Sequence, residues 1–166
     1  MNSKKTVYKY ITIMVVLTAI AFGISVFTIK RSEPPANTGN LNCTIKISCE
    51  NILKNSDILA EEKKEIIPEN GIVLDTTEVS FNEGETAFDI LKNVVSENKI
   101  QIEFSGEADS AYVEGIANIY NFDCGEMSGW LYKVNGEAAD KSAAQYIVNE
   151  NDVIEWVYSC DMGNDI

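Results

Sequence analysis

Hydrophobic residues follow three different patterns along the chain. An apolar run without a charge covers residues 11–29, and its 19 residues are enough to cross a bilayer as a helix. Apolar and polar residues alternate over residues 43–49, which is typical of a half-buried strand. From residue 86 the apolar positions recur at helical intervals. The chain therefore begins with a candidate membrane segment and continues into a domain of strands and helix.

The clearest helix of that domain is expected after Thr86. Thr86 and Asp89 have the spacing of a capping box, in which two side chains pair with the free backbone N–H groups of a helix start. Asn98 is expected to close the helix in a left-handed conformation. The apolar face of this helix consists of Phe88, Leu91, Val94 and Val95.

Most other periodic segments predict strands. Asn135-Gly136 is a strong signal for a two-residue hairpin turn. Short helical turns are expected at residues 61–65 and 143–146, and a tight turn at residues 68–71. Strands are expected at residues 43–49, 77–81, 100–104, 112–119, 130–134 and 152–158. Several strands with one main helix predict an α+β domain with a curved mixed sheet, and a β-grasp-like arrangement fits this order.

The flanks of the apolar run favour an uncleaved anchor. Lys4, Lys5 and Lys9 precede it, which favours a cytoplasmic N-terminus, although Lys30 and Arg31 reduce the asymmetry. A cleaved signal peptide is the alternative, but its apolar core is usually shorter, about 7–15 residues. The expected order is a cytoplasmic N-terminus (1–10), a single-pass transmembrane signal-anchor (11–29), a Pro-rich stalk (30–40) and an extracellular domain (41–166).

Charge divides the chain at the same place. The net charge is −13, yet 5 of the 13 basic residues lie within residues 1–31 and all 26 acidic residues lie beyond. The outer part therefore carries a net charge of −18. Such a surface repels nucleic acid, and it also keeps a domain soluble.

The four cysteines predict two disulfides in an oxidising compartment. The chain has no histidine and no C-x-x-C motif, so no metal site is expected. If residues 43–49 form one strand, Cys43 and Cys49 lie about 20 Å apart and cannot bond each other. Each of them must therefore reach Cys124 or Cys160. Because the first and last strands of a β-grasp run side by side, the favoured pairing is Cys49 with Cys160 and Cys43 with Cys124.

The segments of the outer part also have a familiar order. A strand ending in Cys49 is followed by PENGIVL (68–74), NEGETAFDIL (82–91), FDCG (122–125), SGWLYKVNG (128–136) and YIVNENDVIEWVY (146–158). This order resembles the transcobalamin C-terminal-like domain, a family of Gram-positive surface proteins similar to the β-domain of animal cobalamin carriers. The resemblance implies a β-grasp-like fold.

The resemblance also implies a ligand and the residues that contact it. In the carriers this domain closes over cobalamin that a larger helical domain holds, so a lone domain would supply one wall of a binding site. Ser128, Gly129, Trp130 and Tyr132 match the stretch that faces the corrin ring, and Tyr146 matches another ligand-facing loop. Without histidine, no imidazole can bind cobalt, so a corrinoid would be held through its ring and side amides.

The same aromatic residues could instead belong to the core. Trp130 and Tyr132 share one face of the expected strand, Leu131 and Lys133 share the other, and Trp156 can pack across from them. Exposed rings around a concavity would favour ligand capture, whereas buried rings would remove that argument. Trp130 is the best candidate for a contact role, because Ser128 and Gly129 precede it at the mouth of the strand.

No catalytic function is expected. The chain has no histidine to activate a nucleophile and no glycine-rich phosphate loop. The acidic tail at residues 161–165 lacks the full pattern of a calcium loop. The sequence therefore predicts a membrane-anchored extracellular module that captures cobalamin or another corrinoid for a membrane uptake system or a second surface domain. The alternative is a structural or adhesive module that docks another protein through its aromatic face.

Overall fold

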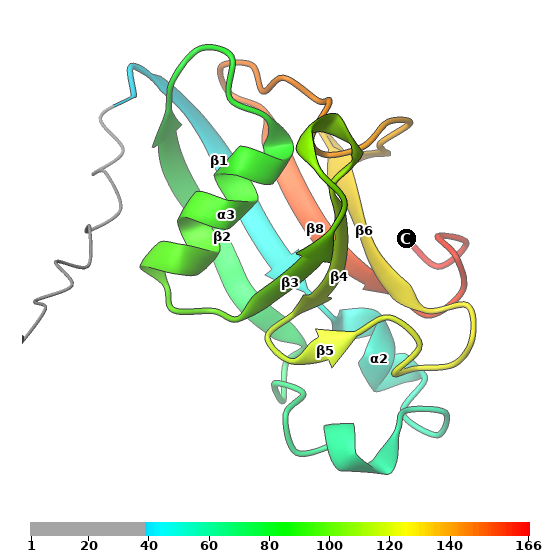
Figure 1. Cartoon of the computed structure of the whole chain (residues 1–166). Coiled ribbons are helices and arrows are strands. Elements are labelled where there is room, and N and C mark those ends of the chain that lie inside the picture. Colours follow the sequence, from blue (N-terminus) through cyan, green and yellow to red (C-terminus); the bar gives the residue numbers. More distant parts are fainter. Residues whose placement is uncertain (1–38) are drawn as a thin grey trace, which may run out of the picture. The chain divides into compact units, whose positions relative to one another are not determined.

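The computed structural model describes residues 39–166, and most of its regular structure is β-sheet. The larger sheet has five strands in the order β2-β1-β8-β6-β7. Figure 1 shows β1, β8 and β6 side by side at its centre. Its strands are β1 (Leu41–Ser48), β2 (Ile72–Phe81), β6 (Gly129–Val134), β7 (Glu137–Ala138) and β8 (Val153–Ser159).

The first and last strands of the domain pair directly. β1 and β8 run parallel, with Thr44 opposite Val153 and Ser48 opposite Val157, as expected for the predicted arrangement. On the predicted inner face of β1, Cys43, Ile45 and Ile47 are buried. The alternation in residues 43–49 therefore marks a central strand with one face on the core.

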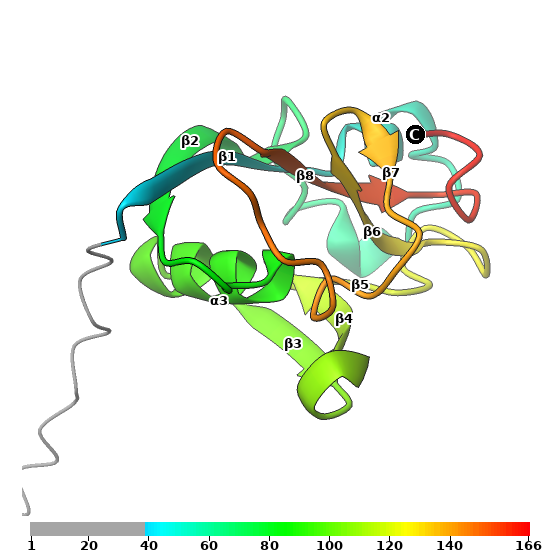
Figure 2. The same cartoon turned by 90° about the horizontal axis from the view of Figure 1, so that it is seen from above.

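A second sheet and the main helix lie on one side of the larger sheet, as Figure 2 shows. The three strands are β3 (Ile102–Ser105), β4 (Tyr112–Ile116) and β5 (Ile119–Tyr120). The α+β class is confirmed, but the strands form two sheets instead of one. The strand expected over residues 112–119 is also wrong in length, because Ala117 and Asn118 take left-handed conformations with φ of 54° and 62° and reverse the chain. Two consecutive left-handed residues fit a tight hairpin turn.

The main helix, α3 (Ala87–Glu97), begins as predicted. The Thr86 hydroxyl accepts a hydrogen bond from the Asp89 N–H at 3.1 Å, and the Thr86 N–H donates to Asp89 Oδ2 at 3.0 Å. The expected left-handed cap at Asn98 is wrong, because Asn98 has φ −88° and the next residue, Lys99, takes φ 57°. The predicted apolar face of α3 is buried against the sheet.

Several shorter predictions differ from the structure in their bounds. β2 begins at residue 72 instead of 77, and Cys49 lies just before a short helix, α2 (Glu50–Lys54), that the sequence did not indicate. The turn at residues 68–71 is confirmed by the hydrogen bond from Gly71 N–H to Pro68 C=O. The Asn135-Gly136 hairpin turn is confirmed as well, with φ of 53° and 86°.

The predicted membrane segment at residues 11–29 lies outside the described residues. Within residues 39–166, no helix has both the length and the apolar character needed to cross a bilayer.

Replacing Thr86 by alanine tests the capping box. The change removes the acceptor for the Asp89 N–H, and loss of such a cap costs about 1 kcal/mol. We expect the free energy of unfolding to fall by about that amount and Tm to fall by about 4 °C. Urea titration and thermal melts followed by circular dichroism measure both. Thr76→Ala, on an exposed position of β2, is the matched control and should leave stability within about 0.5 kcal/mol. Equal effects of the two substitutions would contradict the assignment.

Candidate functional site

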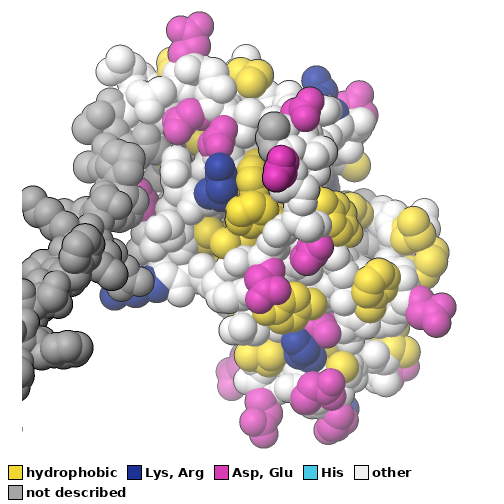
Figure 3. Space-filling view, in the orientation of Figure 1, with side chains coloured by type: hydrophobic (Ala, Val, Ile, Leu, Met, Phe, Trp, Pro, Cys, Tyr) yellow, Lys and Arg dark blue, Asp and Glu magenta, His cyan; other side chains and the backbone are white. Residues whose placement is uncertain are grey.

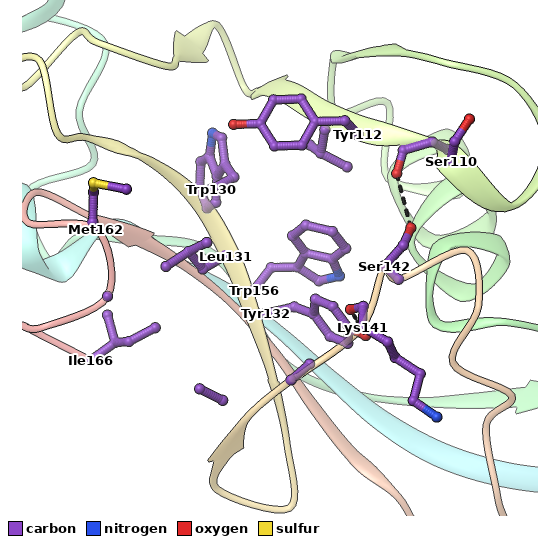
Figure 4. A pocket seen from close by; sticks show the side chains of 16 residues that line it. Ser110, Tyr112, Trp130, Leu131, Tyr132, Lys141, Ser142, Trp156, Met162 and Ile166 are labelled. Carbon is purple, nitrogen blue, oxygen red and sulfur yellow. Dashed lines mark hydrogen bonds between the residues drawn. The ribbon is translucent and has the colours of Figure 1, made fainter.

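A cavity opens beside the first half of β6, near the edge of the larger sheet. Its volume is about 500 Å³, within the range of about 300–1,000 Å³ that is usual for small-molecule sites. In Figure 4, Trp156 and Tyr132 lie in the middle of the wall, Tyr112 lies on the β4 side and Met162 belongs to the C-terminal segment. The aromatic and long side chains of the wall are Tyr112, Trp130, Leu131, Tyr132, Lys141, Trp156, Met162 and Ile166.

The opening results from the short pairing of β7. β7 pairs with β6 only at Lys133 and Val134, and the Ala139 N–H adds one hydrogen bond to the Tyr132 C=O at 3.1 Å. The first half of β6 therefore has no neighbouring strand on its outer side. On the face shown in Figure 3, hydrophobic side chains gather between acidic ones. The cavity is thus an apolar opening on an acidic domain.

Two stacked rings form the deep wall. Tyr132 lies opposite Trp156 in the β6–β8 register, and their ring centroids are 5.4 Å apart at an angle of 28°. The Tyr132 hydroxyl donates to the Lys141 C=O at 2.8 Å. Burial, together with Tyr146 and Asp140, raises the pKa of Tyr132 to about 12, so it stays neutral. The predicted packing of Trp156 against this strand is confirmed.

Trp130 is part of the framework of the cavity. Only 2% of its surface is exposed, its indole N–H donates to the Ile119 C=O at 2.8 Å, and its ring packs edge-on against Tyr158. Tyr132 is 8% exposed. Both rings line the cavity, but they are buried, so exposed rings do not support ligand capture at these two positions.

The exposed part of the wall comes from other residues. Tyr112 is 52% exposed, Leu131 37% and Met162 69%. Sequence reasoning missed all three as contact residues. In the sequence, Tyr112 begins an expected strand, Leu131 lies on the strand face opposite to Trp130, and Met162 belongs to the acidic tail. The one available signal in the sequence was the apolar character of these three side chains.

A smaller cavity of about 200 Å³ adjoins the larger one and shares Tyr112, Trp130, Leu131 and Met162 with it. Ser128 and Gly129 line it. Ser128 is buried, and its hydroxyl accepts from the Cys124 N–H and contacts the Tyr158 hydroxyl. A Cβ on Gly129 would lie 2.7 Å from Asn121 Oδ1, so this glycine leaves room for a neighbouring side chain.

With the site defined, the chain can be placed among known proteins. The sequence model of a domain of unknown function, DUF4430, matches residues 84–159. This segment is similar to DUF4430 domains. The match runs from the turn before α3 to the end of β8 and is consistent with the resemblance to transcobalamin C-terminal-like domains. No curated protein sequence matches the chain significantly.

Two solved structures are distantly similar. A proposed metal-binding protein from Ruminococcus gnavus has a TM-score of 0.45 and 18% identity, covering 72% of this chain and 96% of that one. Haptocorrin in complex with Cbi has a TM-score of 0.47 and 15% identity, covering 71% of this chain but 25% of its own. Both likenesses are distant and concern the fold alone.

Two buried polar atoms of the matched segment have no hydrogen-bond partner among the described residues. They are Trp156 Nε1 and Asn121 Oδ1. Trp156 lines the larger cavity, and Asn121 Oδ1 lies beside Gly129 at the smaller one. Unpaired buried groups are uncommon and often await a water or a ligand. No cluster of three or more metal-ligating side chains occurs within residues 39–166.

The four cysteines predicted to form disulfides are all buried. Cys124 and Cys160 are in contact, with their Sγ atoms 3.2 Å apart. This contact differs from the two expected pairs, Cys49 with Cys160 and Cys43 with Cys124, which stay predictions. The contact arises because the loop that carries Cys124 reaches the end of β8.

Tyr146, the fifth predicted contact residue, lines neither of these two cavities of the domain. Its ring packs edge-on behind Tyr132, and its hydroxyl donates to Asp152 at 3.0 Å. Asn135 and the Asn149 N–H also donate to Asp152. Burial alone would raise the pKa of Asp152, but these hydrogen bonds outweigh it and hold the pKa below its usual value. Tyr146 thus supports the cavity wall from behind.

Replacing Asp152 by asparagine tests this support. A folded pKa below the unfolded value of about 3.9 gives stability above that pH, and this stability is lost as pH falls through the folded pKa. We expect Asp152→Asn to lower the free energy of unfolding at pH 7 by about 2 kcal/mol. We also expect the free energy of unfolding of Asp152→Asn to fall less between pH 5 and pH 3 than that of the unchanged chain.

Urea unfolding at pH 7, 5 and 3 measures both effects. Asp109→Asn, at an exposed position, is the matched control. An identical pH dependence for Asp152→Asn and the unchanged chain would rule out the stabilising role of the carboxylate.

Proposed function

We propose that the domain is a non-catalytic binding module that captures cobalamin or another corrinoid at the larger cavity. The observation that carries the proposal is an apolar cavity of about 500 Å³ with an aromatic wall and one unpaired indole N–H, that of Trp156. Such cavities with few polar groups are the usual form of small-molecule sites. The sequence resemblance to the transcobalamin C-terminal-like family suggests the ligand class.

The dimensions of the cavity limit how a corrinoid would bind. A corrin with its side chains is larger than a drug-sized molecule, so the domain would cover one part of it and supply one wall. The exposed side chains of Tyr112, Leu131 and Met162 would meet the ring, and Trp130 and Tyr132 would support them from beneath. Amide oxygens on the edge of the ligand would suit the Trp156 N–H after a small movement of the wall.

The five residues that match the family have different parts in this proposal. Trp130 and Tyr132 give the site its shape, while Ser128 and Gly129 hold the neighbouring loop. Tyr146 fixes Tyr132 from behind. With no histidine in the chain, the cobalt ion would receive no imidazole ligand from this protein.

The proposed location is the outer surface of the cell membrane, with residues 11–29 as a single-pass anchor and the domain outside. The support is the apolar run itself and the division of charge around it. In this position the module would pass its ligand to a membrane uptake system or to a second surface domain.

One observation favours a second function, docking of another protein. Phe122 is 70% exposed, and its φ of 71° is unusual for a bulky residue, which costs about 1–2 kcal/mol. Strained, exposed residues often mark functional surfaces. Phe122, Met127 and Met162 form an exposed apolar rim around the smaller cavity, and such a rim also suits a protein partner.

Titration with cyanocobalamin and cobinamide tests corrinoid capture. Both tryptophans of the chain line the larger cavity, so a ligand there should quench their fluorescence in a saturable way. We expect Leu131→Ala to weaken binding about tenfold, because it removes exposed apolar contact area worth about 1.4 kcal/mol. Quenching corrected for corrin absorbance and calorimetry together measure the affinity.

The matched control is Leu53→Ala. Leu53 lies on α2, is 43% exposed and lines neither cavity, so its truncation should leave the affinity unchanged. If the unchanged chain gives neither heat nor quenching, the corrinoid proposal fails and a protein partner becomes the better candidate. Equal weakening by both substitutions would place the ligand elsewhere.

Deletion of residues 1–31 tests the anchor. We expect the full chain to remain in the membrane fraction after carbonate washing and the shortened chain to be soluble, because the deletion removes the whole apolar run. Immunoblots of the fractions measure this. If expression of the full chain instead gives a shortened protein in the medium, with a new N-terminus beyond residue 19, a cleaved signal peptide is supported.

A further inference from the structure

Two cysteines meet at a junction between distant segments. Cys124 lies in the loop after β5, and Cys160 directly follows β8, 36 positions later. Both side chains are buried, and their Sγ atoms are 3.2 Å apart. The bond length of a disulfide is about 2.0 Å, so a small rotation of the two side chains would bring the sulfurs to bonding distance.

We propose that Cys124 and Cys160 form a disulfide that fixes the C-terminal segment to the loop framing the smaller cavity, and that Cys43 and Cys49 remain thiols. This bond differs from both pairs expected from the sequence.

The position of the other two cysteines supports this choice. Cys43 lies near the start of β1, opposite Val79 on β2, and about 20 Å along the chain from Cys49. Cys49 is buried at the start of α2, and its N–H donates to the Gly71 C=O. Among the described residues, the sulfur–sulfur contact of Cys160 is with Cys124 and no such contact joins it to Cys49. The geometry therefore allows a bond between Cys124 and Cys160. A second bond would have to join Cys43 to Cys49, which are too far apart.

The disulfide would strengthen a connection that a hydrogen bond already makes, from the Met162 N–H to the Met127 C=O at 2.8 Å. Within the C-terminal segment itself, the Cys160 N–H donates to Asp165 Oδ2 at 2.8 Å. Met127 and Met162 both line the smaller cavity. A covalent link beside them would hold the two methionine-bearing segments at a fixed separation.

The chemistry requires a disulfide oxidant, such as oxidised glutathione or a thiol–disulfide oxidoreductase. One cysteine loses its proton and attacks the oxidant, forming a mixed disulfide and releasing one thiol. The second cysteine loses its proton and attacks the mixed disulfide, which closes the Cys124–Cys160 bond and releases the second thiol. Two electrons pass to the oxidant, and its two sulfurs take up two protons.

The bond should form while the chain folds. Burial is the main cause that raises the pKa of both thiols, and the neighbouring Cys124 raises the pKa of Cys160 further. A thiol with a raised pKa is rarely a thiolate, and the thiolate is the reactive form. Oxidation of the folded, reduced protein should therefore be slow, and so should reduction of the closed bond.

Mapping the cysteines of the full chain tests the proposal. The purified protein is refolded with oxidised and reduced glutathione, unfolded in guanidinium with an alkylating maleimide, digested and analysed by mass spectrometry. We expect two alkylated cysteines, Cys43 and Cys49, and one linked peptide pair containing Cys124 and Cys160. Four alkylated cysteines, or a link from Cys160 to Cys49 or Cys43, would overturn the proposal.

Thermal melts give an independent measurement. Because the bond closes a loop of 36 residues, we expect reduction to lower Tm by about 10 °C. Cys43→Ala is the matched control and should show the same drop, whereas Cys124→Ala and Cys160→Ala should show none. A drop of equal size in Cys124→Ala would locate the bond elsewhere.

The mapping does not require a variant to fold, and neither measurement requires a ligand. Occurrence of the bond in the cell rests on the proposed location outside the cytoplasm, where disulfides persist. Refolding with glutathione tests whether Cys124 and Cys160 can bond, whatever the location of the protein in the cell. Failure of corrinoid binding would therefore leave this result unaffected.

Discussion

The parallel pairing of β1 with β8 is the constraint on which the rest of the domain depends. It joins the first and last strands across more than a hundred residues, so nearly the whole domain lies between the two paired strands in sequence. β2 pairs with the free side of β1, and β6 pairs with the free side of β8. α3 and the three-stranded sheet then cover one face, and the cavities form where β6 has no neighbour.

The pairing of β6 with β8 explains why the aromatic residues of β6 both stabilise the sheet and line the cavity. Trp130 lies opposite Tyr158, and Tyr132 lies opposite Trp156, so two cross-strand aromatic pairs follow each other along one face. These pairs stabilise the sheet next to its open edge. The rings form a rigid wall, and the more exposed side chains of Tyr112, Leu131 and Met162 provide the accessible surface.

Local signals in the sequence predicted local structure well. The capping box of Thr86 and Asp89, the hairpin turn at Asn135-Gly136 and the alternation of β1 each depend on neighbours within a few residues, and the structure contains all three. The α+β class followed from their order. The division into two sheets could not be predicted, because it depends on the left-handed turn at Ala117 and Asn118, for which the residue types give little preference.

The site was harder to predict because it depends on contacts between residues that are distant in sequence. The stretch around Trp130 lines a cavity, but the burial of Trp130 depends on contacts with Ile119 and Tyr158, which are distant in sequence. Met162 and Tyr112 come together only in the folded chain. The contact of Cys124 with Cys160 depends on the path of a long loop, which spacing alone does not determine.

The arrangement of β1, β8 and β6 also determines how the domain would respond to mechanical force. If the proposed anchor holds the chain before Leu41, tension enters at the start of β1. A partner held near Gly129 would pull at the opposite end of the sheet, because Gly129 lies beside Ser159 at the far end of β8. Tension along this line would slide the strands past one another and load many interstrand hydrogen bonds at once. The domain would therefore resist extension more strongly than a sheet whose hydrogen bonds break one after another.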